Sequence, residues 1–197
     1  MIQILNGHSK IVRKRLEILR GAAAEFRERG YAGTRMQDIA RRTAMTPGNL
    51  YYYFRGKHAL LDFCQNHSLD VLLAQARKVL RGRGSSAVKV MALLEAQLRC
   101  MLDELHGAAA HIEFHALPRR ALARIIAKRD RYERLLRGLI ERGIRAGEFA
   151  ACDAKLVTLA ILGAVNWTVR WYRPDGPQSP EAIARTFVDY LVRGLTK

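Results

Sequence analysis

Hydrophobic residues in the first part of the chain recur every three or four positions, which is the spacing of one face of an α-helix. The pattern predicts a first helix over about 9–29. Its inward-facing residues are Val12, Leu16, Leu19, Ala23 and Phe26. Gly30 follows directly, and glycine tolerates the left-handed backbone conformation that commonly ends a helix. We therefore expect the first helix to end at Gly30.

Two short helices follow, and each has its own start signal. Thr34 is a suitable N-cap for a helix that runs to about residue 43. Thr46 is a second N-cap, and Pro47 takes the first helical position, where its missing N–H costs nothing. The third helix is therefore expected over 47–54.

The remainder of the chain also has helical spacing. The further helices are expected at about 57–81, 87–105, 108–116, 119–145, 153–172 and 179–195. No segment alternates with the two-residue period of a strand. The sequence therefore predicts an all-α protein of about nine helices, with one domain over 1–56 and a second domain over 57–197.

Charge adds a possible partner to this pattern. The formal net charge is +16 over 197 residues, and residues 1–57 hold 12 Lys and Arg against 4 Asp and Glu. Such an excess favours a polyanion, nucleic acid first and an anionic membrane surface second. Arginine-rich composition also occurs in proteins that bind neither, so charge alone leaves the partner open. The positive charge is not confined to one amphipathic face, so we expect no membrane binding.

Several classes of protein are not supported by the sequence. The longest apolar stretch, 156–165, is too short to span a bilayer, and the first residues lack a signal-peptide core, so a cytoplasmic location is expected. Gly82-Arg83-Gly84 lacks the third glycine and the flanking strand of a dinucleotide site. No nucleophile elbow or zinc-protease motif is present. We therefore expect that the protein is not an enzyme, has no catalytic residues and binds no cofactor.

Cysteine and histidine spacing gives little support for a metal site. Cys64, Cys100 and Cys152 form no CxxC pair, and we expect them to be small buried apolar residues. His111 and His115 are four residues apart, which is a spacing that can bind a metal. They lack a fixed set of partner ligands, so histidines at the surface or lining a pocket are the favoured interpretation and no metal is expected.

The two short helices after a longer one have the layout of a DNA-binding helix-turn-helix, whose second helix enters the major groove. Gly48 allows that helix a close approach to the duplex. The first-turn N–H groups suit a phosphate, and Asn49 can bind a phosphate or a base edge. Tyr51 and Tyr52 offer hydroxyls for phosphates and rings for thymine methyl groups. For Tyr53, packing within the domain is an equal alternative.

A set of residues spread over these three helices resembles the N-terminal signature of TetR-family regulators. The set is Ile18, Leu19, Ala22, Ala23, Phe26, Gly30, Tyr31, Thr34, Ile39, Ala40, Thr46, Gly48, Leu50, Tyr51, Tyr53, Phe54, Lys57 and Leu60. The resemblance covers roughly 11–61 and implies a homodimeric regulator, commonly a repressor, whose larger C-terminal domain binds a small-molecule effector. Met45-Thr46-Pro47 departs from the usual sequence and could alter the operator.

The resemblance and the helix-turn-helix together give a set of predicted contacts with double-stranded operator DNA. They are Thr34, Arg35, Gln37, Thr46, Pro47, Gly48, Asn49, Tyr51, Tyr52, Tyr53 and Lys57.

Large apolar residues on the last two helices predict a homodimer. The predicted interface residues are Trp171, Phe187, Tyr190 and Leu191. Packing these helices against their symmetry mates would form a four-helix interface, as TetR-like proteins generally do. The alternative is that the same residues fill the core of one chain.

The segment 166–177 resembles the end of the penultimate helix in TetR-type regulators of fatty-acid, aromatic-acid and sterol breakdown, several of which respond to acyl-CoA thioesters. Arginine pairs with phosphate through two hydrogen bonds, which suits the phosphates of CoA. The candidate effector residues are His67, Arg120, Arg124, Trp167, Arg170 and Arg173. The alternative for the arginines is a solvated surface.

Overall fold

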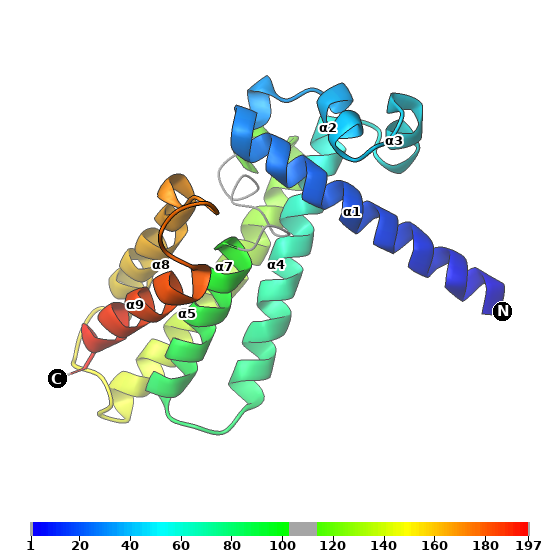
Figure 1. Ribbon diagram of the computed structural model, residues 1–197. Helices are drawn as coiled ribbons and strands as arrows, with labels where there is room; N and C mark the ends of the chain where they lie inside the picture. The colour runs from blue at the N-terminus through cyan, green and yellow to red at the C-terminus, as the bar shows by residue number, and fades with distance from the viewer. Residues whose placement is uncertain (1, 103–113, 197) are drawn as a thin grey trace. The chain divides into compact units, whose positions relative to one another are not determined.

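The computed structural model describes residues 2–102 and 114–196, with side chains from residue 10 onward. Over these residues the chain forms eight α-helices and one 3-10 turn, and no strand (Figure 1). The elements are α1 (Ile2–Gly33), α2 (Met36–Arg42), α3 (Pro47–Tyr53), α4 (Lys57–Arg81), α5 (Ser86–Leu102), η1 (Phe114–Ala116), α7 (Arg119–Arg145), α8 (Ala154–Trp171) and α9 (Pro180–Arg193). The all-α prediction is confirmed. Most of the helix expected at 108–116 lies outside the described residues.

The described residues separate into two compact units. The first, called the N-terminal unit here, contains Met1–His67 and Glu104–Leu122, and the C-terminal unit contains Ser68–Asp103 and Ala123–Lys197. Helices α4 and α7 each contribute residues to both units. The division of the chain at 56/57 stays a prediction.

In the N-terminal unit, α1 is longer than its pattern indicated. It begins at Ile2 rather than near Ser9, and its helical geometry is interrupted at Gly30, where φ is 69°. The early part of α1 extends beyond the residues that α2 and α3 cover (Figure 1). Val12 lies there and is 48% exposed, so its predicted burial is wrong. The core of the unit includes Ile18, Leu19, Phe26, Ile39, Leu50, Phe54 and Leu60.

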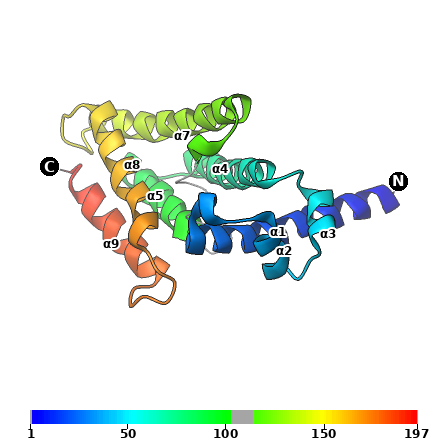
Figure 2. The same cartoon turned by 90° about the horizontal axis from the view of Figure 1, so that it is seen from above.

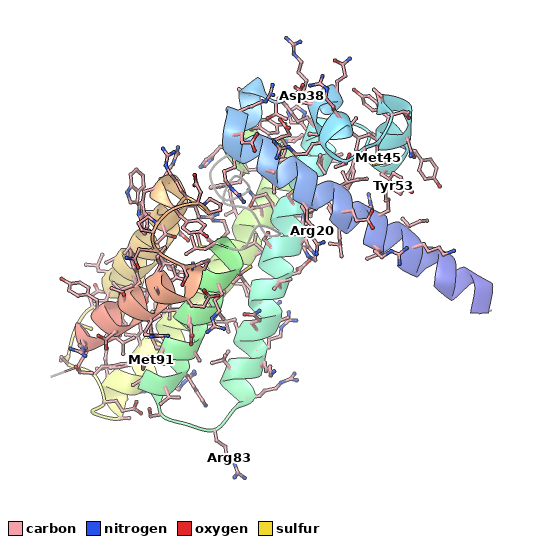
Figure 3. The ribbon with its side chains drawn as sticks, in the orientation of Figure 1. Arg20, Asp38, Met45, Tyr53, Arg83 and Met91 are labelled. Carbon is pink, nitrogen blue, oxygen red and sulfur yellow. The ribbon has the colours of Figure 1, made fainter. Side chains whose placement is uncertain are left out.

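Most of the predicted helix starts are confirmed. Thr46 caps α3 and Pro47 begins it, and Ser179 caps α9, which begins at Pro180. The N-cap predicted at Thr34 is wrong, because α2 begins one residue later and Arg35 occupies the cap position. The Arg35 backbone N–H donates to the carboxylate of Asp38, which is labelled in Figure 3, at 3.1 Å. A residue inside the helix therefore provides the acceptor for the N–H of the cap residue.

In the C-terminal unit, α5 packs against both α8 and α9 (Figure 2). The turn after α7 is tied to the start of α5, because both carboxylate oxygens of Glu148 accept backbone N–H bonds, from Ser86 at 3.1 Å and from Ala87 at 2.9 Å. Tyr132 on α7 is buried, and its hydroxyl donates to the Leu93 carbonyl of α5 at 3.4 Å. These bonds hold segments together that lie about 40 to 60 residues apart in the chain.

Two of the three cysteines are buried as expected, and one is not. Cys64 and Cys100 are buried, whereas Cys152 is exposed in the loop before α8, so the prediction for it is wrong. Desolvation raises the pKa of the Cys64 thiol, which keeps it protonated and inert. In the described part of the chain, no helix is long and apolar enough to cross a membrane.

Candidate nucleic-acid interface

The recognition helix α3 has one buried side and one exposed side. Leu50 and Phe54 are 0% and 2% exposed and hold the helix against the core. Tyr51 and Tyr52 face solvent, at 50% and 75% exposed. Tyr53 is half-buried, and its ring meets the ring of Tyr52 edge-on, with 5.1 Å between centroids. Two tyrosine rings are therefore available on the outer side of this seven-residue helix.

The start of α3 is also open. The Thr46 hydroxyl accepts the backbone N–H of Asn49 at 3.2 Å, which satisfies one of the free donors of the first turn. Pro47, Gly48 and Asn49 are exposed. A Cβ on Gly48 would meet no described atom within 4 Å, so the space directly beside Gly48 is open. The first turn can therefore approach a phosphate closely.

Arg15 of α1 holds the other end of α3. Its guanidinium donates to the Tyr53 carbonyl at 3.4 Å, and the guanidinium carbon lies 4.9 Å from the centre of the Phe54 ring and 5.1 Å from that of Phe63. A cation at the C-terminal end of a helix is electrostatically favourable, and both rings lie within cation–π distance of the guanidinium. The sequence analysis missed Arg15, because nothing local to it indicates a partner 38 residues away.

The turn between α1 and α2 is fixed by Lys57, the first residue of α4. The ammonium lies 2.6 Å from the Tyr31 carbonyl oxygen and 3.0 Å from that of Thr34, and 4.3 Å from the centre of the Tyr31 ring. Thr34 itself is buried, and its hydroxyl donates inward to the Gly30 carbonyl at 2.8 Å. Arg35 and Gln37, at the start of α2, are exposed.

Eight of the predicted DNA contacts are therefore exposed. Six lie on α3 or at its start, and two lie at the start of α2. These are Thr46, Pro47, Gly48, Asn49, Tyr51 and Tyr52, with Arg35 and Gln37. Thr34 and Lys57 instead use their polar side-chain atoms within the unit. A contact from Thr34 to DNA would have to come from its backbone. The DNA contacts stay predictions.

An ion-pair cluster holds α2 against α1. Glu25 is 4% exposed, and its carboxylate accepts from the Arg42 Nε at 2.7 Å and lies 3.2 Å from the Arg29 Nε. Arg42 also donates to Glu28. These hydrogen bonds, first to Glu25 and then to Glu28, raise the pKa of Arg42. Gly21 lies in the same contact, where a Cβ would collide with the Thr43 methyl group.

The C-terminal unit carries a second notable surface, which is apolar. Trp171 on α8 and Phe187 on α9 lie with ring centroids 6.0 Å apart, and Tyr190 is 80% exposed. Leu191 is half-buried. The four predicted interface residues thus lie on the two neighbouring helices, where Trp171 and Phe187 pack together, and their role in a dimer stays a prediction.

The structure adds residues to that surface. Leu156, Leu159 and Trp167 on α8 are 64%, 49% and 64% exposed, whereas Ile161 and Val165 on the other side of the same helix are buried. A helix that is apolar on both sides needs a second partner. The sequence of 156–165 already indicated a second apolar side, because it holds more leucines than one buried face of a helix can accommodate. We call Leu156, Leu159, Trp167, Trp171, Phe187 and Tyr190 the α8–α9 apolar face.

The predicted effector residues divide between the two units. Arg124, Arg170 and Arg173 are exposed on the C-terminal unit, and Trp167 belongs to the α8–α9 apolar face. His67 and Arg120 belong to the N-terminal unit, where the His67 ring stacks on that of Phe63 at 6.1 Å. Of the histidines considered for a metal, His115 is exposed and His111 lies outside the described residues. No three potential metal ligands gather in the described chain.

Comparison with known proteins decides the family. Residues 84–195, more than half of the chain, match the model of the tetracyclin repressor-like C-terminal domain. Residues 18–63 match that of the bacterial regulatory proteins of the tetR family. The chain belongs to the TetR family. TetR-family proteins are regulators that bind DNA, so the helix-turn-helix is assigned to transcription regulation and not to an enzyme.

Three TetR-family relatives span almost the whole chain. The HTH-type transcriptional repressor KstR2 of Mycobacterium tuberculosis is 29% identical over 189 residues, which is 93% of this chain and 94% of the relative. The structure of PfmR from Thermus thermophilus is 32% identical with a TM-score of 0.81, covering 91% of this chain and 99% of that one. AibR in complex with isovaleryl coenzyme A and operator DNA is 26% identical with a TM-score of 0.75, covering 90% and 98%.

Proposed function

We propose that this chain is a transcriptional repressor that binds its operator as a homodimer in the cytoplasm and is released by a small-molecule effector. Helix α3 enters the major groove, and the C-terminal part carries the effector site and the dimer interface. The α8–α9 apolar face supports the dimer. The relatives KstR2, a transcriptional repressor, and AibR, which was solved with operator DNA and isovaleryl coenzyme A, support the two other parts.

The observation that carries the DNA-binding proposal is the exposed surface of α3. Large tyrosine rings face solvent there, although burying them would be favourable, and a bound duplex would cover them. The excess of Lys and Arg over residues 1–57 supplies attraction to phosphates.

A binding titration with DNA from upstream of the protein's own gene tests this proposal. Fluorescence anisotropy should give saturable binding that a scrambled duplex does not compete for, with affinity falling steeply between about 50 and 200 mM salt. Equal affinity for both duplexes would contradict operator binding, because phosphate contacts alone carry no sequence information.

For the effector we propose an acyl-CoA thioester. Support comes from the isovaleryl coenzyme A bound in the AibR complex and from exposed arginines, Arg170 and Arg173, that can pair with the CoA phosphates. Thermal melting of the full chain with a panel of CoA thioesters should raise the midpoint, because a ligand that binds the folded state stabilises it. The same thioesters should release the operator. If free acids do both and no thioester does, this effector class is wrong.

A further inference from the structure

A glutamine lies inside the apolar core of the C-terminal unit. Gln97 of α5 is 3% exposed, and its neighbours one turn away along the helix, Leu94 and Met101, are fully buried. The amide nitrogen donates to the Asn166 side-chain oxygen of α8 at 3.1 Å and lies 3.7 Å from the Met101 sulfur. The amide oxygen has no hydrogen-bond partner among the described residues.

An unpaired buried amide oxygen is costly, because it loses its water and gains no donor. Asn166 and Met101 use only the amide nitrogen, and leucine or methionine would fill a similar volume without leaving an unpaired oxygen. In the orientation observed, the amide nitrogen is used by Asn166 and the oxygen is left without a donor among the described residues. A donor supplied by a bound molecule would satisfy this oxygen.

We propose that Gln97, held in place by Asn166, is the polar anchor of the effector site and accepts a hydrogen bond from the effector. This inference rests on the proposed function, since it assumes that the C-terminal unit binds a ligand, and it adds the chemistry of that ligand. The part of the effector that reaches Gln97 is apolar apart from an uncharged N–H or O–H donor. An ionised carboxylate does not fit, because it has only acceptors to present to an amide oxygen.

The pantetheine arm of an acyl-CoA thioester meets this requirement, because each of its amides carries an N–H. The carbonyl oxygen of the same pantetheine amide can accept a hydrogen bond from the Asn166 side-chain amide. Asn166 is only half-buried on α8, so the pair extends from the core toward the surface. Met101 beside it has a flexible side chain that adapts to ligands of different shape.

The test uses the full chain and thioesters matched in everything except the donor. Butanoyl, octanoyl and dodecanoyl thioesters of N-acetylcysteamine carry an amide N–H, and the corresponding thioesters of N-acetyl-N-methylcysteamine have a methyl group in place of that hydrogen. Octan-1-ol and octanamide provide donors without a thioester, and octanoate is the acceptor-only probe. Dissociation constants are measured by calorimetry for the wild type, for Gln97→Met and for the control Gln75→Met, which changes an exposed glutamine of the same unit.

The wild type and Gln75→Met should bind the donor-bearing member of each pair about tenfold more tightly than its partner. Gln97→Met should remove this ratio. An unchanged ratio in Gln97→Met overturns the anchor while leaving the DNA-binding proposal intact. If octan-1-ol or octanamide binds the wild type about tenfold more tightly than octanoate does, and no thioester binds, the anchor stands and the acyl-CoA proposal fails. No preference for any donor in the wild type overturns the anchor.

A second measurement needs no ligand. If the unpaired oxygen is a cost accepted for binding, ligand-free Gln97→Met should melt at the same temperature as the wild type or higher. A melting temperature lowered by several degrees would mean that the carboxamide stabilises the fold, and this would overturn the proposal whatever the ligands do.

Discussion

Tyr52 is the residue whose exposure most clearly separates function from stability. Its ring is 75% exposed, and its one described aromatic contact is with Tyr53. Tyr52→Ala should weaken operator binding about tenfold or more, because a contact to a base or phosphate contributes about 1–3 kcal/mol. The melting temperature should change little. Anisotropy titrations and thermal melts measure both, and Tyr52→Phe separates the hydroxyl from the ring. Wild-type affinity in Tyr52→Ala would remove α3 from the interface.

Lys57, unlike Tyr52, is expected to contribute to the stability of the fold. Its ammonium is bonded to the Tyr31 and Thr34 carbonyl oxygens, so removing it leaves these acceptors without their donor. Lys57→Met should lower the free energy of unfolding by about 1–3 kcal/mol and weaken DNA binding through the displaced turn. Denaturant unfolding measures the first effect and anisotropy the second.

Lys10→Met is the matched control for Lys57, since Lys10 is an exposed lysine of the same unit. It should leave the free energy of unfolding unchanged. If Lys57→Met weakens DNA binding with no loss of stability, the ammonium contacts DNA directly, as the family resemblance implies.

At the scale of single elements, the sequence predicted what is decided locally. The starts of α3 and α9 follow from Thr46-Pro47 and Ser179-Pro180, because a cap and a first-turn proline act within one helical turn. The start of α2 was placed one residue early for the same reason. Thr34 has the side chain of a cap, but its hydroxyl is taken by the Gly30 carbonyl, and only the tertiary structure shows this.

Contacts between distant elements could not be predicted in this way. Arg15 bonds to the end of α3, and Glu148 bonds to the start of α5 across 62 residues of sequence. From the sequence alone, each of these two side chains is indistinguishable from an ordinary charged residue at the surface. Only the packing of the helices brings it to a helix end, where free backbone groups need a partner. The candidate site was therefore predictable on α3 and not in the residues that position α3.

Glu148 allows a pH test at this scale. The backbone N–H groups of Ala87 and Ser86 lower its pKa from the usual 4.5. A lowered pKa in the folded state means that the carboxylate contributes stability above pH 4.5, which is lost as the pH falls through the lowered value. The wild type should therefore melt above Glu148→Gln at neutral pH, with the difference closing in acid. Glu181→Gln, which changes an exposed glutamate of the first turn of α9, is the control. A difference that is independent of pH would contradict this assignment.

At the scale of the whole molecule, the composition of α8 requires a partner outside the described chain. One side of the helix is already buried by Ile161, Val165 and Val169, and the other leaves Leu156, Leu159 and Trp167 in solvent. The sequence predicted a dimer from the aromatic residues near the ends of α8 and α9. It did not separate the residues that fill the core from those that remain exposed, because both are equally apolar and lie on one helix.

Leu159→Glu tests whether a second copy of the chain covers this side. The leucine is 49% exposed, so glutamate at this position should be tolerated in a monomer but would bury a charge in a dimer. Sedimentation velocity should show a dimer for the wild type and a monomer for Leu159→Glu, and operator affinity should fall by about a hundredfold or more, since a single half-site remains. Met91→Glu, at a 40% exposed methionine of α5, controls for surface charge and should stay dimeric. A dimeric Leu159→Glu variant would mean that Leu159 lies outside the interface, and the subunits would then have to meet through another surface.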